Sequence, residues 1–176
     1  MKSIITYINE ALKLGNKSRY KYHPETKEEL QNLLNQLLKE RGNEGDFNDI
    51  DTSKITDMSD LFYELTNFNG NISQWDVSNV TNMSSMFYRC KSFNKDISKW
   101  DVSNVTNMYS MFRVCRSFNQ DISGWNVSNV TSMYSMFRIC KSFNQDISRW
   151  NVSNVINNID MFYACPLQEK YKPKFK

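Results

Sequence analysis

The chain has 176 residues, of which 40% are hydrophobic and 14% aromatic, with only five glycines and three prolines. This composition is typical of a folded protein with a sizeable core and excludes an intrinsically disordered chain. The formal net charge is +3, and the whole excess lies in residues 166–176, because basic and acidic side chains balance over residues 1–165. A neutral body argues against a broad nucleic-acid-binding surface.

The N-terminal segment predicts neither a signal peptide nor a membrane span. Asn9 and Glu10 interrupt its apolar residues, and no small-residue cleavage site follows. No window in the chain approaches the about 18 apolar residues that a transmembrane helix needs. We therefore expect a cytoplasmic or virion-associated protein without membrane insertion rather than a secreted one. The same segment predicts a helix from about Ser3 to Leu14, with Gly15 after it.

A second helix is predicted after Pro24. Thr26 and Glu29 match the capping-box pattern, and Gly42 is suited to end a helix. Between them, leucines follow helical spacing at positions 30, 33, 34, 37 and 38. We expect the two helices to form a cap, residues 1–45, over the segment that follows; the alternative is that they bind another protein.

Residues 46–165 repeat with a step of 25 residues. The string DISKWDVSNVTNMYSMF at 96–112 returns as DISGWNVSNVTSMYSMF at 121–137, and a weaker copy starts at Phe47. The apolar spacing fits neither a long strand nor a long helix, but a chain that coils around a core. One coil cannot bury its apolar face alone, so we expect about five stacked coils. The most regular columns are Trp75, Trp100, Trp125 and Trp150; Cys90, Cys115, Cys140 and Cys165; and Phe87, Phe112, Phe137 and Phe162.

Within each coil we expect a short strand and a short helix. The run NQDIS, residues 119–123, and its equivalents are predicted to pair with the neighbouring coil, about 4.8 Å away. The run 103–115 is predicted to be a short helix or 3₁₀ turn, with Ser103 and Asn104 suited to its N-cap. The expected fold class is an α/β repeat solenoid: a right-handed, leucine-rich-repeat-like coil of about five repeats with an N-terminal α-helical cap.

The pattern FNxDISxWDVSNVTNMxxMFxxCxS resembles the BspA-like leucine-rich repeat of bacterial surface proteins, also known as a Mycoplasma lipoprotein repeat. The lead-in HPETKEELQNLLNQLL is also similar to the segment that precedes the repeats in many members. The resemblance implies a cell-surface, adhesion or protein–protein interaction role, without catalytic residues. Such repeats also occur in phage-encoded proteins, and the opening MKSIITYINEAL is similar to the start of some phage proteins. A phage- or virion-associated structural or host-interaction protein is therefore the first alternative.

The cysteine column does not match a metal site, because zinc sites need close pairs such as C-x₂-C. We interpret the cysteines and tryptophans of the repeat as core columns with structural thiols. Stacking also brings neighbouring cysteines within disulfide range, but without an export signal reduced thiols are expected.

An enzyme is not expected. The one histidine of the chain is His23, so no Ser-His-Asp or Cys-His set can be assembled within the repeats. There is no P-loop and no glycine-rich dinucleotide turn. We therefore expect no catalytic residue, no cofactor and no metal ion.

Recognition is expected where the copies present exposed aromatic and basic residues, which are favoured at interfaces. We expect an unidentified protein or glycan partner, and a monomer or a subunit of a larger assembly. The second alternative is nucleic-acid binding through the same columns. The basic tail, residues 166–176, is expected to be solvated or to contact an acidic partner. The candidate partner-binding residues are Tyr88, Tyr109, Arg113, Arg116, Tyr134, Arg138 and Lys141.

Overall fold

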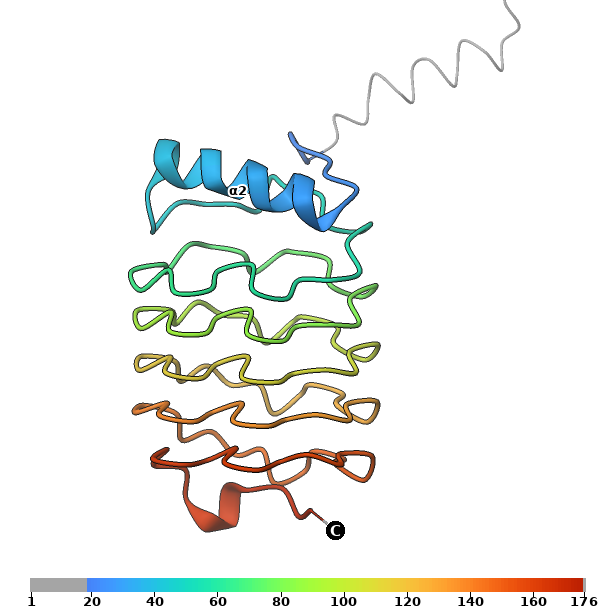
Figure 1. Cartoon of the computed structure of the whole chain (residues 1–176), viewed down its shortest axis with the longest axis vertical. Coiled ribbons are helices and arrows are strands. Elements are labelled where there is room, and N and C mark those ends of the chain that lie inside the picture. The colour runs from blue at the N-terminus through green and yellow to red at the C-terminus, as the bar shows by residue number, and fades with distance from the viewer. Residues whose placement is uncertain (1–18, 176) are drawn as a thin grey trace, which may run out of the picture.

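The repeated segment winds into coils that are stacked one below the other (Figure 1). The computed structural model describes residues 19–175, so the helix predicted from about Ser3 to Leu14 lies outside the described residues. Helix α2 (Lys27–Arg41) lies across one end of the stack, and the 3₁₀ helix η1 (Glu169–Tyr171) lies at the other. In the described part of the chain, no helix is long and apolar enough to cross a membrane.

Helix α2 confirms the predicted capping signals. The Thr26 side chain accepts a hydrogen bond from the backbone N–H of Glu29 at 3.2 Å, which satisfies a free donor of the first turn. At the other end the N–H of Gly42, with φ +71°, donates to the carbonyl of Leu38. Its apolar stripe, Leu30, Leu34 and Leu37, is buried in the same core cluster as the first coil, so α2 covers the end of the stack.

The expected α/β fold class is wrong. Between residues 19 and 175 there is no β-strand, and the only helices are α2 and η1. Residues 119–123 form no strand and residues 103–115 form no helix; both runs consist of turns and irregular backbone. Pairing between coils that resembles a sheet is limited to isolated parallel bridges, such as that between Asn82 and Asn107.

The missing strands are explained by the way each coil divides its backbone hydrogen bonds. We name residues 57–65, 82–90, 107–115, 132–140 and 157–165 the ladder segments. In the first four, alternate N–H groups cross to the next coil, while those between them close turns within their own coil. In 107–115 the N–H groups of Met108, Ser110, Phe112 and Val114 donate to the carbonyls of Ser132, Tyr134, Met136 and Arg138 at 2.9, 2.8, 3.0 and 2.8 Å.

The turns require left-handed backbone at two positions in every ladder segment. In 107–115 the N–H of Met111 donates to the carbonyl of Met108, and the N–H of Cys115 to that of Phe112. The third residues of these turns, Ser110 and Val114, have φ of 51° and 66°. Positive φ at this position is the mark of a type II turn. A chain that reverses at every turn cannot extend into a strand, and it lacks the i→i−4 bonds of a helix.

Stacked side chains fill the inside of the coils. The ring of Phe112 lies between those of Phe87 and Phe137, with centroid distances of 5.5 and 5.7 Å. Each indole N–H also reaches back to the previous coil: that of Trp100 donates to the carbonyl of Ile72 at 3.2 Å. Buried indole groups need such an acceptor, so the tryptophan column joins the coils by hydrogen bonds as well as by contact.

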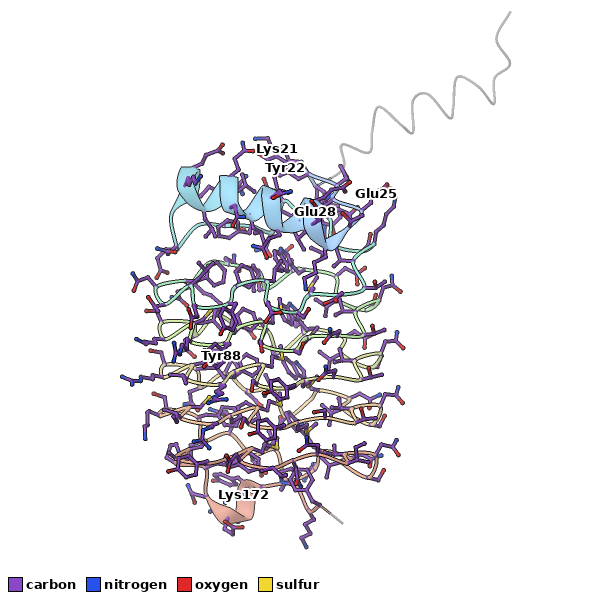
Figure 2. The ribbon with its side chains drawn as sticks, viewed as in Figure 1. Lys21, Tyr22, Glu25, Glu28, Tyr88 and Lys172 are labelled. Atoms are coloured by element: carbon purple, nitrogen blue, oxygen red, sulfur yellow. The ribbon has the colours of Figure 1, made fainter. Side chains whose placement is uncertain are left out.

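Residues 166–175 fold back over the last coil, residues 141–165. Leu167 and Pro173 are buried, and the N–H of Ile147 donates to the carbonyl of Tyr171 at 3.1 Å. The tail is therefore not the free, solvated end expected from its charge, since its apolar residues cover part of the core. Its lysines remain at the surface, as Lys172 does beside η1 (Figure 2).

Candidate functional site

The cysteines and tryptophans of the repeat lie inside the stack. Cys90, Cys115 and Cys140 are fully buried free thiols, and Cys165 is partly buried. Their Sγ–H groups reach back across the coils, as that of Cys115 does when it donates to the carbonyl of Phe87 at 2.8 Å. Burial raises the pKa of these thiols well above the ordinary value, so they remain protonated donors. Trp75, Trp100, Trp125 and Trp150 are 3, 3, 4 and 5% exposed.

The candidate partner-binding residues lie in the ladder segments or directly after them. We name this set the Tyr/Arg face: Tyr88, Tyr109, Arg113, Arg116, Tyr134, Arg138 and Lys141. Figure 2 marks the position of Tyr88 on the coils below α2. Because each ladder segment repeats the same turns, equivalent side chains emerge above one another along the stack.

One column of the repeat, which includes residues of the Tyr/Arg face, combines aromatic rings with guanidinium groups in the order Tyr63, Tyr88, Arg113, Arg138 and Tyr163. The rings of Tyr63 and Tyr88 are stacked, with centroids 4.8 Å apart and planes at 11°. The guanidinium of Arg113 lies 5.5 Å from the Tyr88 centroid, and that of Arg138 lies 4.1 Å from the Tyr163 centroid. Cation–π contacts of this kind hold the charged groups in place while leaving the outer side of the rings free.

A second column consists of stacked tyrosines. The rings of Tyr109 and Tyr134 have centroids 5.1 Å apart and lie within 6° of parallel. Tyr109 is 40% exposed and Tyr134 is partly exposed, so the pair presents aromatic surface to solvent. Stacking restricts the ring rotamers, so less side-chain entropy is lost when a partner binds here.

The charges of the Tyr/Arg face fall into two groups. Arg138 forms an ion pair with Asp160, and neighbouring Arg89 forms one with Glu64. In the described part of the chain, no ion pair is formed by Arg113, Arg116 or Lys141, nor by Lys91 of the same column. The Nε atom of Arg113 is also buried without a hydrogen-bond partner. The face therefore has free donors and positive charge for a partner that offers acceptors.

An open groove of about 390 Å³ runs along the edge of this face. It is lined by Arg116, Lys91 and Arg89, with Val114 and Ile139 as its apolar part. Arg89 and Tyr63 contribute to the face although the sequence analysis did not select them. Tyr63 could have been predicted, because it lies one repeat of 25 residues before Tyr88. Nothing in the sequence indicates that the guanidinium of Arg89 lies 5.3 Å from the ring centroid of Tyr88.

A larger hollow, of about 550 Å³, lies beside α2 and is lined in part by Arg41, Asp46, Asn48 and Asp49. Two of its charges are already paired, because the guanidinium of Arg41 donates to both carboxylate oxygens of Asp49 at 2.7 and 2.9 Å. This bidentate contact holds the pKa of Asp49 below its ordinary value. The contact between Arg41 and Asp49 therefore joins α2 to the first coil. The residues that line the hollow are separate in sequence from the Tyr/Arg face.

The histidine and several of the carboxylates of the described residues have defined partners. His23 lies next to Asp51, with 3.2 Å between Nδ1 and Oδ2, and the hydroxyl of Ser53 donates to the other oxygen of Asp51 at 2.7 Å rather than to His23. No group of three or more potential metal-ligating side chains occurs in the same part of the chain. The aspartates of the repeat serve its turns, as Asp101 does by accepting a hydrogen bond from the N–H of Ser103 at 3.0 Å.

Comparison with known proteins places the chain in a family. No curated protein and no solved structure gives a significant match. A family model described as "Mycoplasma protein of unknown function, DUF285" matches residues 29–137 and, in a second and overlapping copy, residues 100–172. Together the two matches span α2 and all of the coils, so the chain belongs to the DUF285 family of Mycoplasma proteins.

Proposed function

We propose that this chain is a non-catalytic protein-binding module that recognises its partner through the Tyr/Arg face. The observation that carries the proposal is the stacked, exposed pair Tyr109–Tyr134 on the same ladder segments as the unpaired Arg113. Tyrosine and arginine dominate the binding energy of many protein interfaces. A surface on which they are already ordered loses less entropy on binding than one built from mobile side chains.

The extent of the face favours a macromolecular partner over a small ligand. Small-molecule sites are concave and bury most of their ligand. Here one column of tyrosines and arginines continues from Tyr63 to Tyr163 along the stack, and the groove next to it is open. A protein can contact several coils at once, which supports a role in protein–protein interaction.

The finer family assignment belongs to the same proposal. The repeat resembles the BspA-like leucine-rich repeat, and membership of DUF285 agrees with a Mycoplasma repeat family. On this basis we propose a BspA-like protein whose interaction serves adhesion or contact at a cell surface. The binding residues would be those at which the copies differ, because the identical columns are occupied by the core.

The experiment uses residues that other coils already carry, so that the coils keep their turns. In the variant Tyr109→Ser, Tyr134→Ser, Arg116→Thr, the new side chains are those of Ser84 and Thr66 at equivalent positions. The wild-type chain and the variant are immobilised, and proteins captured from cells of the source organism are identified by mass spectrometry after cross-linking. We expect a defined set of proteins to be captured by the wild type and at least about tenfold less by the variant.

A matched control removes one positive charge from the other side of the repeat. Lys99→Gln introduces the residue found at the equivalent Gln74 and should leave capture unchanged. Melting temperatures of all three proteins establish that they are folded. Equal capture by the wild type and the Tyr/Arg face variant would refute the proposal.

Nucleic-acid binding is a second candidate because one observation favours it. The Tyr109–Tyr134 stack could accept bases, and the basic column Lys91, Arg116 and Lys141 could follow a phosphate backbone. The affinity for a nucleic acid would fall steeply as the salt concentration rises, whereas the affinity of a protein interface with aromatic anchors depends less on salt. Titration with single-stranded RNA and DNA at about 50 mM salt tests this candidate, and absence of binding removes it.

A further inference from the structure

The backbone of the ladder segments has a direction that persists through the whole stack. In the first four ladder segments the N–H groups at alternate positions donate away from α2, and the carbonyls that accept them point toward it; only the first residue of a segment donates in the other direction, as Asn107 does to Thr81. In the last pairing, Met133, Ser135, Phe137 and Ile139 donate to the carbonyls of Asn157, Ile159, Met161 and Tyr163 at 2.8, 2.9, 2.9 and 2.9 Å. The next row of N–H groups, on Asn158, Asp160, Phe162 and Ala164, has no acceptor in the part of the chain that the structure describes. The last coil therefore presents a row of aligned free donors.

Apolar side chains border this row, although a coil at the end of a repeat array is expected to have a polar outer face. Ile156, Ile159 and Tyr163 are 89, 63 and 57% exposed. The repeat itself does not require them: three equivalents of Ile156 are Thr81, Thr106 and Thr131. The last coil thus carries an isoleucine where the earlier coils carry threonine, and a second one, Ile159, where they carry tyrosine or serine. Exposed apolar clusters of this kind mark interaction sites.

The tail leaves this part of the coil open and makes its surroundings positive. Residues 166–175 cover the side of the coil that includes Ile147, whose N–H donates to the carbonyl of Tyr171. The tail contains the whole positive excess of the chain. The ammonium group of Lys172 lies 5.6 Å from the ring centroid of Phe162 and forms an ion pair with Glu169 at 2.6 Å, whereas Lys170 and Lys174 form none in the described part of the chain. We name residues 156–164 the open edge.

We propose that the open edge binds an acidic segment of another polypeptide that adopts the turns of a ladder segment, so that its backbone carbonyls accept hydrogen bonds from Asn158, Asp160, Phe162 and Ala164. The segment would continue the ladder, in the way that a peptide strand adds to the edge of a sheet. Its acidic side chains would complement the lysines of the tail, and its apolar side chains would cover Ile156 and Ile159. This site is separate from the Tyr/Arg face and does not depend on the function proposed for it.

The directions of the hydrogen bonds exclude simple self-pairing. Two copies that meet edge to edge would place N–H donors against N–H donors, which leaves both rows unsatisfied. The other end of a second copy is covered by α2, where Gln31 already donates to the carbonyl of Leu61 at 3.2 Å. A nucleic acid could offer phosphate acceptors but would leave the isoleucines without an apolar partner.

The first ladder segment supplies a probe with the required register. Its carbonyls lie at the repeat positions whose equivalents accept hydrogen bonds in the later ladder segments, and it contains Asp57, Asp60 and Glu64. The probe is the acetylated and amidated peptide TDMSDLFYEL, residues 56–65, labelled with a fluorophore. We expect it to bind the full chain in a fluorescence-polarisation titration, and the same peptide with Asn and Gln in place of Asp and Glu to bind more weakly.

Amide hydrogen exchange tests the backbone contacts directly. Binding should slow exchange at Asn158, Asp160, Phe162 and Ala164. The N–H of Tyr163, which already donates within its own turn to Asp160, should change less. Peptide binding without protection of these four amides would overturn the proposal.

Substitutions test the apolar part of the open edge. Ile156→Thr with Ile159→Ser introduces the residues that earlier coils carry at positions 131 and 84, so folding is preserved. We expect the affinity for the peptide to fall on the order of tenfold or more, whereas Arg116→Thr on the Tyr/Arg face should leave it unchanged. Unchanged affinity of the isoleucine variant, equal binding of single-stranded RNA at the same amides, or concentration-dependent dimerisation abolished by that variant would each overturn the proposal.

Discussion

The phenylalanine column allows one substitution to be compared at two sites that differ in their stacking. Phe112 and Phe162 occupy equivalent positions of the repeat. The ring of Phe112 is fully buried, with the centroids of Phe87, Phe118 and Phe137 at 5.5, 4.2 and 5.7 Å. Phe162 is partly exposed and contacts Phe137 at 6.0 Å. We predict that Phe112→Leu lowers the free energy of unfolding much more than Phe162→Leu.

The expected magnitudes follow from these contacts. Aromatic pairs contribute about 0.5–1.5 kcal/mol each beyond their buried area. Three pairs at the low end of this range give about 1.5–2 kcal/mol for Phe112, and loss of volume at a closely packed site adds about 0.5–1 kcal/mol. The total for Phe112→Leu is about 2–3 kcal/mol. Phe162→Leu loses one longer contact at a site that water already reaches, so about 0.5–1 kcal/mol is expected.

Urea unfolding of both variants, followed by tryptophan fluorescence and far-UV circular dichroism, measures the difference by linear extrapolation. Phe137→Leu serves as a positive control, because its ring is buried between Phe112 and Phe162 and should behave like Phe112. Equal losses for Phe112→Leu and Phe162→Leu would refute the reasoning, since hydrophobicity alone would then explain the column.

Three further predictions concern the thiols, the turns and the cap. Burial and a raised pKa should make Cys115 unreactive toward thiol reagents in the native protein, so that Cys165 is modified first and Cys115 only on unfolding, as mass spectrometry can follow. Hydrogen bonds from Ser103 hold the pKa of Asp101 below its ordinary value of about 4, so the carboxylate stabilises the fold above about pH 4 and this stabilisation is lost as the pH falls further. The melting temperature of Asp101→Asn should therefore decrease less than that of the wild type between about pH 6 and pH 3. An equal decrease would contradict the role given to the Asp101 carboxylate. Thr26→Ala should cost about 1 kcal/mol in urea unfolding through loss of the α2 cap, and no change would show that the cap is dispensable.

The two helices of the described chain were not equally readable from the sequence. Helix α2 was predictable because its signals are local: the capping residues Thr26 and Glu29, the leucine spacing and the stop at Gly42 all lie within one stretch. Helix η1 gave no such signal, because it forms where the tail packs on the last coil. From their charge, its residues were predicted to be part of a solvated end. The buried Leu167 and Pro173 show that the apolar residues of the tail, and not its lysines, determine that it packs on the last coil.

The candidate residues of the Tyr/Arg face were predictable as a group from the repeat step, which brings equivalent side chains into one column. Their pairing was not predictable. Equivalence in the repeat does not distinguish Arg138, which forms an ion pair with Asp160, from Arg113, which forms none in the described part of the chain. That difference arises because Asp160 replaces the serine found at the equivalent Ser135, one coil away in space but 22 residues from Arg138 along the chain.

The sequence by itself determined that a core is built from identical columns, because side chains that recur at a constant step can be buried only when the copies stack. It did not determine the local backbone. Val114 and Ile139 prefer extended conformations as β-branched residues, yet their φ angles are 66° and 63°. Only the tertiary structure decided the positive φ of Val114 and Ile139. Each of them donates its N–H to the next coil, while the turn that contains it is closed by a hydrogen bond within its own coil. The hydrogen bonds between coils outweigh the local preference, which is why strands and helices were expected and turns are found.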